Sequence, residues 1–137
     1  MTRSMMQAGL LVLIALLAGG AASAQDASVK KDGTLICSSF SAQPKTSPAW
    51  HEKVSVEIAR YAITVIRTDY PPPKGVAFKG LVAPSGAILI AGEGSDEGQA
   101  WNYEFSGKLN ASGTTDLRGK LTATKGTLGY RVCSMSF

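Results

Sequence analysis

Apolar and polar residues alternate one by one along most of the chain after residue 32. The clearest example is the segment 101–109, in which Trp101, Tyr103 and Phe105 share one face while polar residues occupy the positions between them. Successive side chains of a strand point to opposite faces of a sheet, so this pattern predicts a half-buried strand with the aromatic side chains inward. The chain after residue 32 has no apolar stripe at helical spacing, and we therefore predict an all-β fold.

Turn residues divide this alternation into eight predicted strands. Pro84-Ser85-Gly86 and the segment 110–113 are typical of hairpin turns, because Pro presets φ and Gly accepts a positive φ. The strands are expected at residues 34–40, 54–58, 61–68, 76–83, 87–93, 101–109, 116–123 and 129–136. Eight consecutive antiparallel strands favour an up-and-down barrel, with a two-sheet β-sandwich as the alternative.

The two cysteines of the chain lie in the first and last predicted strands, at Cys37 and Cys133. In an oxidising compartment, two lone cysteines of a small domain most simply form one disulfide. The first and last strands of a barrel are neighbours, so this bond would lie at the seam where the sheet closes on itself. A redox pair or a zinc site is disfavoured by the spacing and by the lack of partner ligands.

Residues 1–24 have the layout of a cleaved secretory signal peptide. A short polar start precedes an apolar run from Leu10 to Ala18 and the small-residue pattern Ala22-Ser23-Ala24. The alternative is an uncleaved membrane anchor, but the apolar run is shorter than the roughly 20 residues that span a bilayer. We expect cleavage before Gln25, a flexible leader at residues 25–31, a single β domain at residues 32–137 and a periplasmic or secreted location.

Connections alternate between the two ends of an up-and-down fold, so the predicted loops can be sorted by end. The connections at residues 41–52, 69–75, 94–100 and 124–128 fall at one end, which we call the loop end, and the tight turns fall at the other. Binding loops are usually carried on one end of a rigid scaffold. The candidate contact residues are Trp50, His51, Tyr70, Lys74, Asp96 and Glu97. The alternative is ordinary loop chemistry, in which Pro stiffens the chain, Trp50 covers the barrel end and the charged side chains are solvated.

Charge and residue counts narrow the chemistry further. The net charge of +4 is not gathered into a basic run, so nucleic acid is not an expected partner. His51 is the single histidine, and no second one is present to complete a metal site. We therefore expect no enzyme activity, no cofactor and no bound metal. The charged residues on the outward faces also argue against a lipid-facing barrel, so the processed chain is not expected to span a membrane.

The predicted inward face carries several large side chains. Trp101, Tyr103 and Phe105 are expected to meet Val56, Ile58 and Phe78 from other strands. Such a set either fills an eight-stranded barrel or leaves an apolar cavity for one ligand. We favour a filled core, because a small single domain needs the buried area for stability.

The segments Asp32 to Cys37, Ser85-Gly86, Trp101 to Leu109, Leu117 to Gly119 and Arg131 to Cys133 together resemble uncharacterised small secreted β proteins of Gram-negative bacteria that are closed by a disulfide. In architecture the chain is similar to lipocalin-like and avidin-like barrels, including periplasmic inhibitors of secreted proteases. It lacks the inhibitory N-terminal segment of those inhibitors. The resemblance implies a fold and a compartment, and it transfers no binding residues.

These observations lead to one functional expectation with three alternatives. The chain is expected to be a non-enzymatic binding module that recognises a protein or a small ligand through the loop end. The alternatives are a carrier of a small hydrophobic molecule inside the barrel, a structural envelope protein without a specific site, and an enzyme that uses His51.

Overall fold

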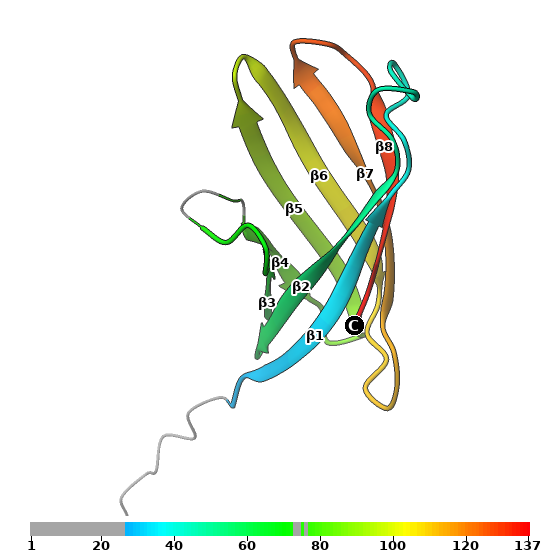
Figure 1. Ribbon diagram of the computed structural model, residues 1–137. Coiled ribbons are helices and arrows are strands. Elements are labelled where there is room, and N and C mark those ends of the chain that lie inside the picture. The colour runs from blue at the N-terminus through cyan, green and yellow to red at the C-terminus, as the bar shows by residue number, and fades with distance from the viewer. Residues whose placement is uncertain (1–26, 73–74, 76) are drawn as a thin grey trace, which may run out of the picture.

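The computed structural model describes residues 27–72, 75 and 77–137, and these residues form a closed antiparallel barrel (Figure 1). Each strand is hydrogen-bonded to its neighbours in chain order, and the last strand pairs with the first. The strands are β1 (Val29–Cys37), β2 (Trp50–Ala59), β3 (Ala62–Arg67), β4 (Ala77–Val82), β5 (Ala87–Asp96), β6 (Gln99–Lys108), β7 (Asp116–Lys125) and β8 (Tyr130–Ser136). The prediction of an eight-stranded up-and-down barrel is therefore confirmed, and the sandwich alternative is not.

The predicted signal peptide at residues 1–24 lies outside the described residues. Within the described part of the chain, no helix is long and apolar enough to cross a membrane.

The first strand begins earlier than the sequence pattern indicates. β1 pairs continuously with β2, from Val29 opposite Ile58 to Cys37 opposite Trp50. Residues 29–31, which were expected to belong to a flexible leader, therefore lie in the sheet. The alternation of apolar and polar residues does not reveal this part of the strand, because Lys30 and Lys31 follow each other and none of the residues 29–31 is buried.

The lower part of the barrel, away from the loop end, is filled by apolar side chains. The ring centroid of Phe78 lies 4.5 Å from that of Tyr103 and 6.1 Å from that of Phe105. Paired backbone hydrogen bonds between Thr115 and Phe137 join the two segments that close this end of the barrel. Of the predicted inward set, Val56, Phe78, Tyr103 and Phe105 are buried, whereas Ile58 and Trp101 are partly buried.

Gly119 in β7 makes room for Phe105, one of the large side chains of this core. It lies directly opposite Phe105 in the pairing of β6 with β7. A Cβ atom at Gly119 would come within 2.7 Å of Phe105 Cδ1 and would also collide with the backbone carbonyl of Glu104. Phe105 and Gly119 thus fit each other as a large and a small residue across the ladder.

The disulfide between Cys37 and Cys133 closes the barrel seam. The two residues are directly opposite each other in the pairing of β1 with β8, and the S–S distance is 2.01 Å. The prediction made from the cysteine positions is therefore confirmed. The bond is consistent with an oxidising compartment.

The barrel wall is incomplete on one side near the loop end. β3 and β4 have six residues each; besides pairing with each other, β3 pairs with Val54–Ala59 of β2 and β4 pairs with Ile88–Ala91 of β5. Among the described residues, no strand therefore lies between the upper residues of β2, Trp50 to Glu52, and those of β5, Gly92 to Asp96. Figure 1 shows residues 68–72, which follow β3, lower on the barrel than the turns at the top.

Candidate ligand-binding cavity

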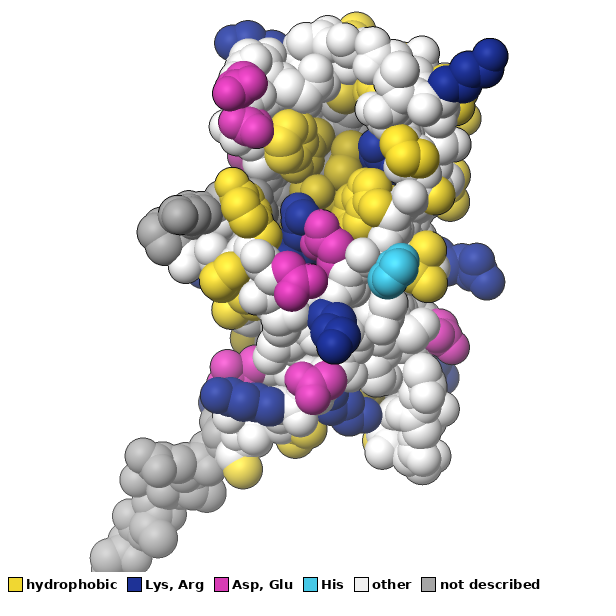
Figure 2. Space-filling view, viewed as in Figure 1, with side chains coloured by type: hydrophobic (Ala, Val, Ile, Leu, Met, Phe, Trp, Pro, Cys, Tyr) yellow, Lys and Arg dark blue, Asp and Glu magenta, His cyan; other side chains and the backbone are white. Residues whose placement is uncertain are grey.

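A cavity of about 350 Å³ occupies the upper part of the barrel, above the filled core. Figure 2 shows it as a hollow in the side of the molecule, rimmed by hydrophobic side chains, with charged side chains at its lower edge. The lining comes from β2, β3, β6, β7, β8 and the connections between β1 and β2 and between β7 and β8. It comprises Phe40, Gln43, Ser47, Trp50, Glu52, Arg67, Gln99, Trp101, Tyr103, Leu121, Ala123, Thr127 and Arg131.

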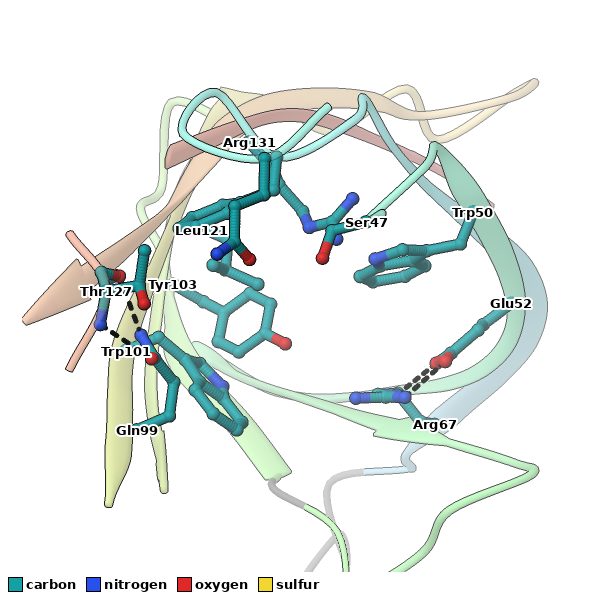
Figure 3. Close-up of a pocket in the computed structure, with 13 residues that line it drawn as sticks. Ser47, Trp50, Glu52, Arg67, Gln99, Trp101, Tyr103, Leu121, Thr127 and Arg131 are labelled. Atoms are coloured by element: carbon teal, nitrogen blue, oxygen red, sulfur yellow. Dashed lines mark hydrogen bonds and ion pairs between the residues drawn. The ribbon is translucent and has the colours of Figure 1, made fainter. Parts of the chain in front are cut away.

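Arg67 and Glu52 form a two-point ion pair in the cavity wall. Arg67 Nη2 donates to Glu52 Oε1, and Arg67 Nε faces Glu52 Oε2 (Figure 3). The guanidinium carbon lies 5.5 Å from the ring centroid of Trp50 and 5.7 Å from that of Tyr70. Paired donors and acceptors of this kind fix both side chains. The charge of Arg67 is thus compensated within the wall, and its guanidinium group is held between aromatic rings.

Arg131 is the second arginine of the cavity, and its environment differs. Its Nη1 donates to the backbone carbonyls of Ser38 and Pro48, both at 2.7 Å. The guanidinium carbon lies 5.8 Å from the centroid of the Phe40 ring. Burial lowers the pKa of Arg131, while the nearby Tyr103 acts in the opposite direction. Since an arginine pKa stays far above neutral pH, Arg131 keeps its positive charge, and carbonyl groups do not neutralise it.

Arg131 also anchors the connection between β1 and β2 above the cavity. Two further bonds hold this loop to β8, because Ser41 N donates to the carbonyl of Tyr130 and Tyr130 N donates to Ser41 Oγ. The loop is therefore attached at several points, and it supplies Gln43 and Ser47 to the cavity lining.

Tyr103 and Trp101 bring polar atoms to the opposite wall. Burial raises the pKa of the Tyr103 hydroxyl, and the nearby Arg67 cation partly opposes this shift. The hydroxyl is therefore neutral at physiological pH and can donate a hydrogen bond. In the part of the chain that the structure describes, Trp101 Nε1 is buried without a hydrogen bond of ordinary geometry, although the Trp101 side chain acts on the Tyr103 hydroxyl and lowers its pKa. Gln99, by contrast, is satisfied by Thr127, since their amide groups exchange two hydrogen bonds of 3.0 Å.

The six residues predicted to make contacts are not brought together. Trp50 lines the cavity, and Tyr70 lies beside it against Arg67. His51 is exposed and lies opposite the exposed Ile36, on the outer face of β2. Asp96 and Glu97 are exposed at the tip of the β5–β6 hairpin and do not line the cavity. Lys74 lies outside the described residues.

Three predicted loops at the loop end were wrong in their extent, one of them because residues 124–125 belong to β7. Residues 94–100 form the ends of β5 and β6 with a two-residue turn at Glu97-Gly98, whose φ angles are both positive. This is the backbone of a type I′ hairpin turn, which continues the strands and leaves no loop. Residues 50–52 belong to β2 and not to a connection. The loop end is therefore less open than the sequence suggested.

The alternation that identified the strands also contains the signal for the cavity residues it did not nominate. Glu52 continues the inward face of Val54 and Val56, and Arg67 continues that of Ile63 and Val65. Arg131 continues the inward face of Cys133 and Met135. A charged residue at an inward position near a strand end indicates a polar cavity there, because burial of an unpaired charge in a filled core is too costly.

Comparisons with protein-family models, with curated proteins and with solved structures gave no match to this chain. Among the described residues, no group of three or more His, Cys, Asp or Glu side chains could hold a metal ion. The fold and the cavity therefore define the site by themselves, as an antiparallel barrel with a partly polar, aromatic-lined cavity at one end.

Proposed function

We propose that this protein is a non-enzymatic binding protein that holds one small molecule in the cavity at the loop end of the barrel. The observation that carries the proposal is the cavity itself, about 350 Å³ in volume and lined by Trp50, Trp101 and Tyr103 together with charged groups. Small-molecule sites are concave, mostly apolar and equipped with a few polar groups that orient the ligand. Their volumes begin at about 300 Å³, so the ligand is of modest size.

The arrangement of the loop end favours a small ligand over a protein partner. The hairpin turn at Glu97-Gly98 offers little surface, and the connection between β1 and β2 is bonded down onto β8. Trp50, Trp101 and Tyr103 face the cavity, whereas Tyr70 and Tyr130 are exposed. His51 lies on the outer face, away from the cavity residues, which favours binding over catalysis at that residue.

The proposal places the protein in the periplasm or outside the cell. The signal-peptide pattern of residues 1–24 and the disulfide both support that compartment. The plan, in which a ligand is held in one end of an eight-stranded barrel, is the one that the similarity to lipocalin-like barrels suggested.

Filling the cavity is expected to abolish ligand binding. Ala123 is a small residue of the cavity lining, so Ala123→Phe places an aromatic ring where the ligand would lie. The wild-type protein is expected to bind the uncharged fluorescent probe N-phenyl-1-naphthylamine saturably at one site, and Ala123→Phe is expected to weaken this binding at least about tenfold. Titration followed by probe fluorescence measures both affinities.

The matched control is Ala91→Phe, because Ala91 is exposed on the outer face of β5. It adds the same ring outside the barrel and is expected to leave probe binding unchanged. Equal loss of binding in both variants, or unaltered binding in Ala123→Phe, would contradict the proposal.

A further inference from the structure

Arg131 and Trp101 bring hydrogen-bond donors to the cavity that the described residues do not fully pair. Arg131 makes its described hydrogen bonds through Nη1 alone, so Nε and Nη2 have no described partner. Trp101 Nε1 is a buried donor without a hydrogen bond of ordinary geometry among the described residues. An unmatched buried donor of this kind is costly, and a ligand that brings an acceptor removes that cost. The free nitrogens of Arg131 are open to water, which an acceptor of the ligand would replace. A ligand rich in acceptor oxygen is therefore favoured.

The charge of the cavity points the same way. Its lining contains two cations, Arg67 and Arg131, and a single carboxylate, that of Glu52. Glu52 is fully engaged with Arg67 through both of its oxygens. One positive charge, on Arg131, is thus left without a counterion in the lining. A cation would meet repulsion here, and one negative charge on the ligand would restore balance.

The apolar part of a ligand has a defined place as well. Figure 3 shows Trp50 on one side of the space and Tyr103 with Trp101 on the other. Arg131 reaches in from one end, and the pair of Arg67 and Glu52 lies at the opposite end. Aromatic rings facing one another across a slot favour a flat group between them, in offset or tilted contact.

We propose that the ligand is a small aromatic carboxylate, held with its carboxylate on Arg131 and its ring between Trp50 and the pair of Tyr103 and Trp101. This inference rests on the proposed function and names the chemical class of its ligand. A planar guanidinium group matches a carboxylate through two parallel N–H bonds. A phosphate ester carries up to two negative charges, which exceeds the single uncompensated charge of this lining.

The first test compares three compounds that share one ring system, namely 2-naphthoate, 2-naphthamide and 2-naphthylmethylamine. Isothermal titration of the wild-type protein at neutral pH is expected to give the tightest binding for 2-naphthoate. Loss of one charge-assisted hydrogen-bonding pair predicts that 2-naphthamide binds about ten- to a hundredfold more weakly. The ammonium compound is expected to bind more weakly still.

The second test determines which arginine is responsible for the preference for the carboxylate over the amide. Arg131→Met is expected to bring the affinities for 2-naphthoate and 2-naphthamide within about threefold of each other, because the charge-assisted bond is lost. The double variant Glu52→Gln/Arg67→Gln removes a neutral pair, so its preference for the carboxylate is expected to persist even if both affinities shift together. Arg118→Met, on the outer face of β7, is the matched control and is expected to change neither affinity.

Because Arg131 also anchors the loop above the cavity, Arg131→Lys is included as the conservative variant. Lysine keeps the positive charge but lacks the planar guanidinium group, so this variant is expected to retain part of the preference for 2-naphthoate over 2-naphthamide. Circular dichroism and the melting temperature of each variant show whether it folds.

The outcomes separate the two proposals. If none of the three compounds binds to the wild-type protein, the proposed function is overturned together with the ligand class. If 2-naphthamide binds as tightly as 2-naphthoate, the ligand class is overturned and small-molecule binding stands. If the preference disappears in the Gln double variant and persists in Arg131→Met, the assignment of the carboxylate to Arg131 is overturned.

Discussion

Replacing the disulfide with two alanines, in Cys37→Ala/Cys133→Ala, is expected to lower the free energy of unfolding by about 4 to 5 kcal/mol. The bond closes a loop with a sequence separation of 96 residues, so it removes a large amount of conformational freedom from the unfolded chain. Both cysteines are buried, and alanine avoids placing an unpaired hydroxyl group in the core. A loss of this size is a large part of the total stability of a typical domain. Urea denaturation of the oxidised wild type and of the variant measures the difference.

The control for this experiment is a reducing agent. Reduction is expected to destabilise the wild type and to leave the alanine variant unchanged. Equal stability of the oxidised wild type and the alanine variant would show that the seam is held by strand pairing alone.

Phe105→Ala is expected to destabilise the protein by about 3 to 5 kcal/mol, the range found when a buried phenylalanine is truncated. The Phe105 side chain is 1% exposed, packs against Phe78 and lies directly against the backbone of Gly119. Glycine has no side chain that could move into the space left by the Phe105 ring, so the void created by the substitution would persist. The Phe105 ring is not part of the ligand cavity lining, and the loss is therefore one of core packing.

Leu89→Ala provides the comparison, because Leu89 is 65% exposed on the outer face of β5. Its expected cost is below about 1 kcal/mol. If Phe105→Ala and Leu89→Ala have the same denaturation midpoint, the lower barrel is not the packed core described above.

The alternation of side chains was enough to predict the barrel, because most inward positions of this chain are apolar and most outward positions are polar. The segment Trp101 to Leu109 and its neighbour after the turn at Asn110 follow this rule and are β6 and β7 in the structure. This rule failed in segments where the inward positions are not apolar. The acidic, glycine-containing stretch 94–98 was predicted to be part of a loop, yet it forms the end of β5 and a hairpin turn. β4 pairs with β5 only as far as Ala91, so the part of β5 beyond it does not face a packed core and needs no apolar side chains.

The candidate site could be predicted only in part, for a related reason. Trp50 was nominated because it is aromatic and lies near a proline-containing segment, and it does line the cavity. Glu52 and Arg67 become informative only as a pair, and their pairing depends on the register of β2 with β3. Arg131 is anchored by carbonyls of residues from the far end of the chain, a contact that no local pattern encodes. Sequence position predicts which face a residue occupies, whereas the depth of the core determines whether that face is packed or hollow.

The missing stretch of wall between the upper parts of β2 and β5 has a consequence for ligand exchange. A molecule entering sideways between these strands does not have to displace the connection between β1 and β2, which stays bonded to β8. For the proposed ligand, this route is expected to need no opening of that connection, so that exchange depends on diffusion to the gap and on the affinity of the cavity. Under the proposed function, such a barrel would equilibrate quickly with the ligand around it. That behaviour would suit a protein that reports or buffers a concentration better than one that seals a cargo for transport over long distances.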